Sequence, residues 1–160
     1  MLLHLLRHAH AGDPSHFRGP DAARPLSDKG REQSRRLGRF LSDHHFSTDR
    51  IVSSPKVRAR ETADIVAEIV GSSVVVDDRL AGALDLAILE ALLDDHDDPQ
   101  RPILVGHDPD FSELLAALTD AAGVPMRKGA FARIEVDRPV RPGSGTLRWL
   151  IPPDALTTEG

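Results

Sequence analysis

The chain has 160 residues, the size of one ordinary globular domain, and 40% of them are hydrophobic, which is enough to fill a single core. Its formal charge of −5 argues against general binding to nucleic acid or to an anionic membrane. The lack of cysteine excludes disulfides, thiolate metal sites, iron–sulfur clusters and every mechanism with a cysteine nucleophile, including that of the cysteine-dependent phosphatases.

The sequence has no apolar run close to the roughly 20 residues that span a bilayer. The apolar segment 1–6 is too short for a signal peptide and is followed at once by Arg7. We therefore expect a cytoplasmic protein without a membrane partner. We also expect residues 1–160 to form a single domain, with a frayed tail over about 152–160.

Short apolar runs alternate with segments of helical periodicity along the chain. The apolar runs are too short for helices and predict strands at residues 2–7, 50–53, 73–76, 102–105, 131–136 and 146–151. A loop rich in Gly, Pro and Asp follows the first strand, over residues 9–25. Helices are predicted after the N-cap Ser27, from Ser54-Pro55 to Gly71, and over 85–93 and 110–119.

This alternation predicts an α/β fold, because strands separated by helices of this length usually form a largely parallel sheet. We expect a three-layer α/β/α sandwich with a mixed, mostly parallel central sheet of about six strands and helices on both faces. The two adjacent strands near the end of the chain predict an antiparallel edge.

Four residues suited to binding a phosphate lie at corresponding places in the predicted sheet. His8 and His107 each follow a strand, at the carboxyl ends where open α/β sheets bind ligands. Arg7 precedes His8, and Arg58 lies in the first turn of a helix, where unpaired N–H groups and the helix dipole favour an anion. A guanidinium adds a two-pronged donor that matches phosphate oxygens. Each residue alone is better explained as an ordinary buried or solvated side chain, but the four together predict one anion site.

Four segments resemble, in order, the motifs of the histidine phosphatase (phosphoglycerate mutase-like) superfamily. They are Leu6-Arg7-His8-Ala9, the Arg24–Gly30 segment (RPLSDKG), the Ser53–Thr62 segment (SSPKVRARET) and Val105-Gly106-His107. Any one of these motifs is weak, whereas four in family order are specific, and they span residues 2 to about 118. The chain is too short for the helical insertions that roof the pocket of larger members. It therefore resembles the compact, SixA-type branch of bacterial phosphohistidine phosphatases.

The resemblance implies a phosphoglycerate mutase-like fold and a phosphatase that uses neither a metal nor another cofactor. His8 would be the nucleophile, which is phosphorylated before water releases inorganic phosphate. It would attack through one neutral ring nitrogen, while an acceptor such as a backbone carbonyl holds the proton on the other. Arg7, Arg58 and His107 would bind the equatorial phosphoryl oxygens in the transition state. Arg24 matches a further arginine of the SixA-type branch and is assigned to phosphate binding.

The sequence departs from the family pattern at two positions. Ala9 replaces the usual Gly, so the backbone there should not need a positive φ. Ala81 stands where the superfamily commonly has the carboxylic acid that protonates the leaving group. Asp85 is the nearest substitute for that general acid, but it also fits the N-cap of the following helix, and we favour the cap.

A missing general acid would carry information about the substrate. Loss of the acid typically costs about 10²–10⁴-fold with an alkoxide leaving group. The imidazole of phosphohistidine, by contrast, leaves readily once its ring carries a second proton. A weak or absent acid therefore favours a phosphoramidate over a sugar phosphate.

An open pocket and the SixA-type resemblance imply a substrate phosphoryl group on another protein, such as a histidine-containing phosphotransfer domain in signal transduction. Two alternatives stay open: a phosphatase of small phosphoesters, and a non-catalytic module that binds phosphohistidine or phosphoserine. A mutase is less expected, because an open pocket retains its intermediate poorly. His8-Ala9-His10 also has the spacing of a zinc site, but the enzymes that use it need a barrel of about 250 residues, so we expect no metal.

Overall fold

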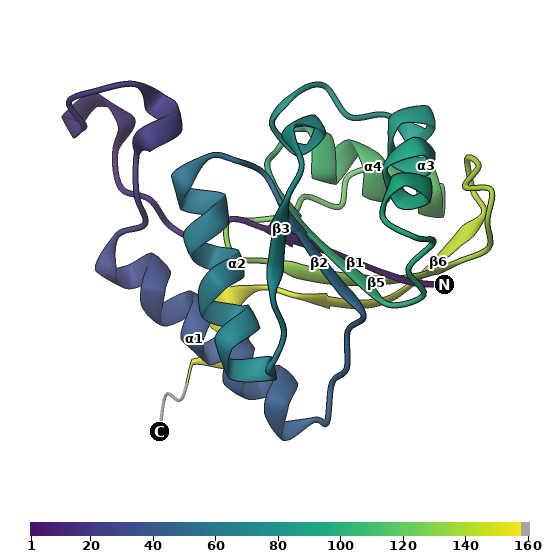
Figure 1. Ribbon diagram of the computed structural model, residues 1–160, viewed down its shortest axis with the longest axis horizontal. Coiled ribbons are helices and arrows are strands. Elements are labelled where there is room, and N and C mark those ends of the chain that lie inside the picture. Colours follow the sequence, from purple (N-terminus) through teal and green to yellow (C-terminus); the bar gives the residue numbers. More distant parts are fainter. Residues whose placement is uncertain (158–160) are drawn as a thin grey trace.

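The computed structural model describes residues 1–157 and has one six-stranded sheet at its centre (Figure 1). The strands are β1 (Leu2–Arg7), β2 (Arg50–Ser53), β3 (Val74–Val76), β4 (Pro102–Gly106), β5 (Phe131–Val136) and β6 (Gly145–Ile151). Their order across the sheet is β3-β2-β4-β1-β5-β6. The first four in this order pair in parallel, whereas β5 is antiparallel to both β1 and β6. The predicted mixed sheet and its antiparallel edge are confirmed.

Helices cover both faces of the sheet, which gives the predicted three-layer sandwich. The helices are α1 (Asp28–Asp43), α2 (Val57–Val70), α3 (Leu86–Asp95) and α4 (Asp110–Thr119). Figure 1 shows α1 and α2 together on one face and α3 and α4 on the other. Ile103 and Leu104 are neighbours on β4 but belong to opposite hydrophobic clusters, because successive strand side chains point to opposite faces. This explains why β4 is apolar without a break and fully buried.

The strand register brings the carboxyl ends of β1, β2 and β4 side by side. Arg7 pairs with Gly106, and the next amide, that of His8, donates to the Gly106 carbonyl at 3.0 Å. On the other side of β4, the Ser54 amide donates to the Val105 carbonyl at 2.9 Å. Residues that follow these three strands therefore lie together at the carboxyl ends of the parallel strands, and the site is located there.

The start of α2 differs from the sequence prediction. Ser54-Pro55 was expected to cap the helix, but α2 begins at Val57, and its N-cap position is Lys56, whose backbone is extended and whose side chain makes no capping bond. The physical reason is the hydrogen bond from Ser54 to Val105, which keeps the chain in the sheet for one residue beyond β2. The hydroxyl of Ser54 accepts from the Lys56 amide at 3.2 Å and makes a second contact, described below.

A short turn follows β6 near the C-terminal end of the described residues. Residues Pro153–Leu156 form a short 3₁₀ turn, η4, and Leu156 packs against the hydrophobic cluster beneath α1 and α2. Fraying of the tail from residue 152 stays a prediction, and the contact of Leu156 is the point at which this turn is attached. The rest of the predicted tail, residues 158–160, lies outside the described residues. Within residues 1–157, none of the helices combines the length and the apolar character needed to cross a bilayer.

Candidate active site

His8 is the first residue after β1, and its side chain is buried with one ring nitrogen committed. Nδ1 lies 2.8 Å from the carbonyl oxygen of Ala9. A carbonyl can only accept, so Nδ1 carries the proton and Nε2 carries the lone pair. Burial lowers the pKa of His8 to about 4, with help from the charges of Arg58 and Arg7, although the bond to Ala9 opposes the shift. At neutral pH the ring is uncharged and oriented, which is the state that the sequence analysis required of a nucleophile.

The loop that leaves His8 is tied to α2 through a threonine. The Ala9 amide donates to Thr62 Oγ1 at 3.1 Å, and the same hydroxyl donates to the Arg58 carbonyl at 2.8 Å. The backbone of Ala9 does not have a positive φ, which agrees with the presence of a Cβ at this position. These contacts explain the last position of the SSPKVRARET segment, because Thr62 joins the strand end that carries His8 to the helix turn that carries Arg58.

His107 faces His8 across the site, with 5.2 Å between the ring centroids. Its Nε2 lies 2.7 Å from Ser54 Oγ, so the serine that does not cap α2 orients this ring instead. Burial lowers the pKa of His107 to about 3, together with the charges of His8, Lys56 and the site arginines. His107 is therefore also neutral at pH 7 in the absence of an anion.

Arg58 and Arg7 each present a buried N–H group without an acceptor. The two terminal nitrogens of Arg58 donate to Asp21, one to its carbonyl and one to its carboxylate, both at 2.9 Å. Arg7 donates through Nη1 to the Met126 carbonyl at 2.8 Å. In both arginines, Nε is buried and has no partner in the described part of the chain. The rings of His8 and His107 are 5.2 Å apart, and Arg7 directly precedes His8. Arg58 is tied to the loop after His8 through Thr62, so the four residues lie in one region of the molecule.

A buried donor without a partner is costly, so these two N–H groups indicate an acceptor that the protein itself does not supply. Arg50 has a third such Nε, but it stands at the opposite end of β2, away from His8 and His107. The sequence predicted that Arg7, His8, Arg58 and His107 would converge on one anion. The structure brings the four together.

Arg24 lies at the edge of this site and is 7% exposed. Its Nη1 donates to the Ala11 carbonyl at 2.8 Å, and its Nε lies 3.3 Å from an oxygen of Asp21. These bonds hold the loop that follows His8, while the charge of Arg24 helps to lower the pKa of Lys128. Binding of phosphate by Arg24 stays a prediction.

The rest of the RPLSDKG segment packs the start of α1 against the loop after His8. Ser27 caps the helix by accepting from the Gly30 amide at 3.1 Å, as predicted. A Cβ at Gly30 would lie 2.0 Å from the His10 carbonyl oxygen, so no other residue fits there without moving the loop. Gly30 thus permits the close approach that positions residues 9–12.

Asp85 makes the contact that the sequence analysis favoured. It is the N-cap of α3, with its Oδ1 accepting from the Ile88 amide at 2.8 Å. Its carboxylate is exposed, and it is not among the charged groups that shift the pKa of His8 or His107. The carboxylate nearest to Arg7 is Asp108, at 3.5 Å, but its two oxygens accept from the amide and the hydroxyl of Ser112. Within residues 1–157, no group of three or more His, Asp or Glu side chains is arranged to hold a metal ion.

Lys128 belongs to the site, although the sequence analysis did not select it. The Gly129 amide donates to the carbonyls of both Arg7 and His8, at 3.1 and 2.9 Å, which holds the turn before β5 against the end of β1. Burial lowers the pKa of Lys128, helped by the charges of Arg7 and Arg24 among others, and the charge of Lys128 in turn lowers the pKa of His8.

The sequence offers no signal that identifies this residue, although lysine is scarce in the chain. The chain has seventeen arginines and only three lysines. Lys56 helps to lower the pKa of His107, Lys29 that of His10, and Lys128 that of His8. All three lysines thus lie near the residues that follow β1 and β4, which composition alone did not reveal.

Three buried neutral histidines predict a loss of stability in mild acid. Burial lowers the pKa of His4 and His107 to about 3 and that of His8 to about 4. Below pH 6.5 the unfolded chain takes up protons at these positions and the folded protein does not, so the free energy of unfolding falls as the pH falls. At pH 5 each histidine is expected to cost about 2 kcal/mol relative to pH 7.

Urea unfolding at pH 7 and pH 5 measures this difference. The variant His4→Phe should reduce it by about 2 kcal/mol, whereas a change at the exposed His16 should leave it unaltered. Equal stability of the unsubstituted protein at the two pH values would contradict the expectation.

The sheet topology, the two opposed histidines and the arginines with free donors define a phosphatase of the histidine type. Residues 3–103 match the family model described as "Histidine phosphatase superfamily (branch 1)", which covers more than half of the chain. The chain therefore belongs to this superfamily and is a phosphatase, as the sequence motifs predicted.

Its relatives support the SixA-type branch. The chain is 27% identical over 158 residues to the phosphohistidine phosphatase SixA of Escherichia coli strain K12, covering 96% of this chain and 94% of the relative. A solved structure of the protein histidine phosphatase SixA with tungstate superposes with a TM-score of 0.83, at 26% identity, over 98% of this chain and 100% of the other. The α-ribazole phosphatase of Shigella flexneri has the same fold, with a TM-score of 0.73 at 21% identity and complete coverage of both chains.

Proposed function

We propose that the protein removes the phosphoryl group from phosphohistidine on another protein, without a metal, through a phosphorylated His8. The observation that carries this proposal is the neutral, oriented His8 ring, in a site whose two arginines, Arg7 and Arg58, each have a buried Nε–H group without a partner among the described residues. They provide donors for the oxygens of a phosphoryl group, and His8 Nε2 provides the lone pair that attacks phosphorus.

The first step transfers the phosphoryl group to His8. The lone pair of Nε2 forms a bond to phosphorus while the P–N bond of the substrate breaks. The substrate ring carries a proton on its other nitrogen, so it keeps the electron pair of the broken bond and departs as neutral imidazole. The His8 ring becomes positively charged, and its Nδ1–H stays bonded to the Ala9 carbonyl, which stabilises that charge. In the second step water attacks phosphorus, the bond to Nε2 breaks, inorganic phosphate leaves and His8 returns to its neutral form.

The surrounding groups bind the charge that spreads over the equatorial oxygens. Arg7 and Arg58 donate their free Nε–H groups, and His107 is held by Ser54 on the other side of His8. A bound phosphoryl dianion offsets the cationic surroundings that lower the pKa of His107, so its ring gains a proton more readily when substrate is present.

The leaving group is the reason to prefer phosphohistidine. Asp85 caps α3, and Asp108 is bonded through both oxygens to Ser112, so we assign neither carboxyl as the acid that would protonate an alkoxide. The imidazole of phosphohistidine leaves as a neutral ring without that help when its other nitrogen carries a proton. The name of the E. coli relative, phosphohistidine phosphatase, agrees with this preference.

Turnover of three substrates tests the proposal: a phosphohistidine peptide, p-nitrophenyl phosphate and glycerol phosphate. The alkyl ester is expected to have a kcat/KM at least about 10²-fold below that of the peptide, because its alkoxide lacks a proton donor. Activity should persist in EDTA. Comparable turnover of peptide and alkyl ester would instead indicate a small-molecule phosphatase, and binding of the peptide without phosphate release would indicate a phospho-binding module.

A further inference from the structure

A hollow of about 550 Å³ adjoins the phosphoryl site and shares Arg7 with it. We call it the basic basin, because its cationic lining residues come from three separate segments: Arg7 at the end of β1, Lys29 and Arg36 on α1, and Arg127 and Lys128 in the turn before β5. Asp154 is the carboxylate among the residues that line it. Such a gathering of positive charge is notable on a chain whose formal charge is −5.

The charges of the basin are available to a ligand. Over residues 1–157, Lys29, Arg127 and Lys128 form no ion pair with a carboxylate, and Arg36 has a single contact, to Glu32 at 3.5 Å. Lys29 and Arg127 are exposed, so an incoming anion meets them without a large desolvation cost. The basin therefore attracts anions.

The spacing of these cations exceeds what one small anion needs. Lys29 and Arg36 are seven residues apart on α1, which corresponds to about 10 Å along the helix axis. Arg127 and Lys128 stand on a different segment of the lining. Several carboxylates on a protein surface match such a spread, because a helix presents residues three, four and seven apart on one face.

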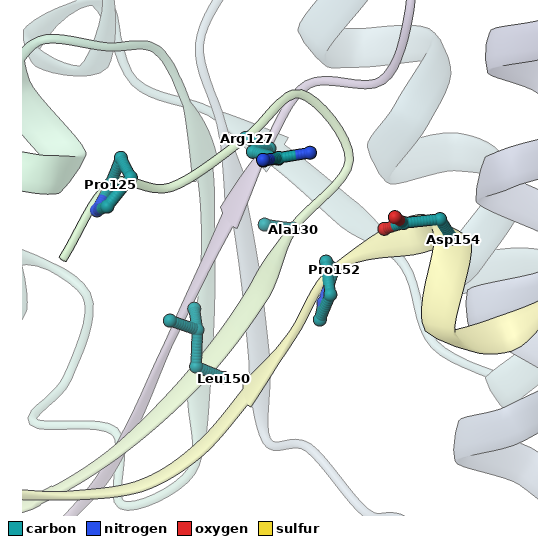
Figure 2. A pocket seen from close by; sticks show the side chains of 6 residues that line it. All are labelled: Pro125, Arg127, Ala130, Leu150, Pro152 and Asp154. Atoms are coloured by element: carbon teal, nitrogen blue, oxygen red, sulfur yellow. The ribbon is translucent and has the colours of Figure 1, made fainter.

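An apolar pocket of about 440 Å³ adjoins the basin and shares Arg127 and Asp154 with it. Its other lining residues are Pro125, Ala130, Leu150 and Pro152. In Figure 2 the guanidinium of Arg127 and the carboxylate of Asp154, which line both hollows, point toward each other above Pro152. A small bisphosphate has no apolar group that could fill this pocket. A protein surface that carries both acidic and aliphatic side chains can bind the basin and the pocket together.

We propose that the basic basin and the adjoining apolar pocket form a docking surface for the acidic face of the phosphorylated protein whose phosphoryl group reaches His8. This inference rests on the proposed function and adds the chemistry of the partner to it. Complementary charge of this kind accelerates encounter and selects among partners, and its effect weakens as salt is added.

Two synthetic peptides of equal length test the inference. Each contains one phosphohistidine and one leucine; the flanking residues are glutamates in one peptide and serines in the other. At low salt, kcat/KM is expected to be about tenfold higher for the acidic peptide than for the serine peptide. The ratio of the two values should fall as the sodium chloride concentration is raised.

A double charge reversal, Lys29→Glu with Arg127→Glu, is expected to remove the preference for the acidic peptide. The matched control is Arg141→Glu, an exposed arginine in the connection from β5 to β6, beyond the end of β5 that pairs with the start of β1. This control should keep the preference. Fluorescence anisotropy of the unphosphorylated acidic peptide gives a second readout that does not depend on catalysis, and binding should weaken in the double variant alone.

Three results would overturn the docking surface. The first is equal kcat/KM and equal binding for the two peptides, and the second is an equal loss of preference in Arg141→Glu. The third is inhibition of turnover by a compact bisphosphate under conditions where the unphosphorylated acidic peptide does not inhibit. The last result would make the basin a subsite for a small molecule. If neither phosphohistidine peptide is hydrolysed, the proposed function fails, and the anisotropy measurement still decides whether the basin binds acidic peptides.

Discussion

Replacing His8 with alanine is expected to lower kcat by about 10⁴-fold or more, both for a phosphohistidine peptide and for p-nitrophenyl phosphate. The variant removes the lone pair that accepts the phosphoryl group, and His107 lies across the site with its Nε2 held at Ser54. Steady-state assays measure the loss of activity. Rapid quenching of the unsubstituted protein, followed by mass spectrometry, should show one phosphoryl group attached to His8.

Two observations separate a lost nucleophile from a lost fold. The alanine variant should still bind inorganic phosphate, because Arg7 and Arg58 keep their donors. The matched variant His107→Ala should lose activity as well but should still form the adduct on His8. A phosphoryl group trapped on His107 or on any other side chain, or more than about one per cent residual activity in His8→Ala, would contradict the assigned role.

The architecture could be predicted from the sequence because its signals are local. The unbroken apolar segment of β4 predicts a strand buried on both faces, and Ser27 and Asp85 are found at the N-caps where side-chain chemistry puts them. The positions of His8 and His107 after their strands also follow from sequence, because parallel strands end at a common edge. The register of β1 against β4 then makes the two residues neighbours.

The contacts that prepare the site could not be predicted, because they join residues far apart in sequence. Ser54 was expected to cap a helix, whereas its hydroxyl meets His107, 53 positions away. Arg7 reaches the carbonyl of Met126 across 119 positions. A motif identifies a residue by its type and its near neighbours, and it carries no information about such partners.

Asp21 and Lys128 illustrate the same limit. Asp21 lies in a loop whose composition predicts only turns, yet it accepts hydrogen bonds from both Arg24 and Arg58. Lys128 precedes a glycine whose amide bonds to the backbone of β1, and only the folded chain brings the two segments together. The sequence therefore predicted the groups proposed to touch phosphorus and its oxygens, and missed the groups that hold them in place.

Replacing Arg58 with alanine is expected to lower kcat/KM by about 10²–10³-fold, the typical loss when one donor to a transition-state oxyanion is removed. Inorganic phosphate should also inhibit the variant more weakly. Arg58→Lys keeps the charge but not the planar guanidinium. Its kcat/KM should lie between those of Arg58→Ala and the unsubstituted protein. The result needs a control, because Arg58 also holds the loop of residues 9–25 through Asp21, with two bonds of 2.9 Å.

Asp21→Asn supplies that control, because it weakens the tie to the loop and leaves the guanidinium in place. Asp21 is exposed, and hydrogen bonds from Arg58 lower the pKa of its carboxyl, so it is ionised at neutral pH. Its replacement should change kcat/KM by no more than about tenfold, since the guanidinium of Arg58, with its unpartnered Nε–H group, is left in place. If Asp21→Asn were as damaging as Arg58→Ala, Arg58 would act by holding the loop, and the oxygens of the phosphoryl group would have to be bound by Arg7, His107 and Lys128 without it.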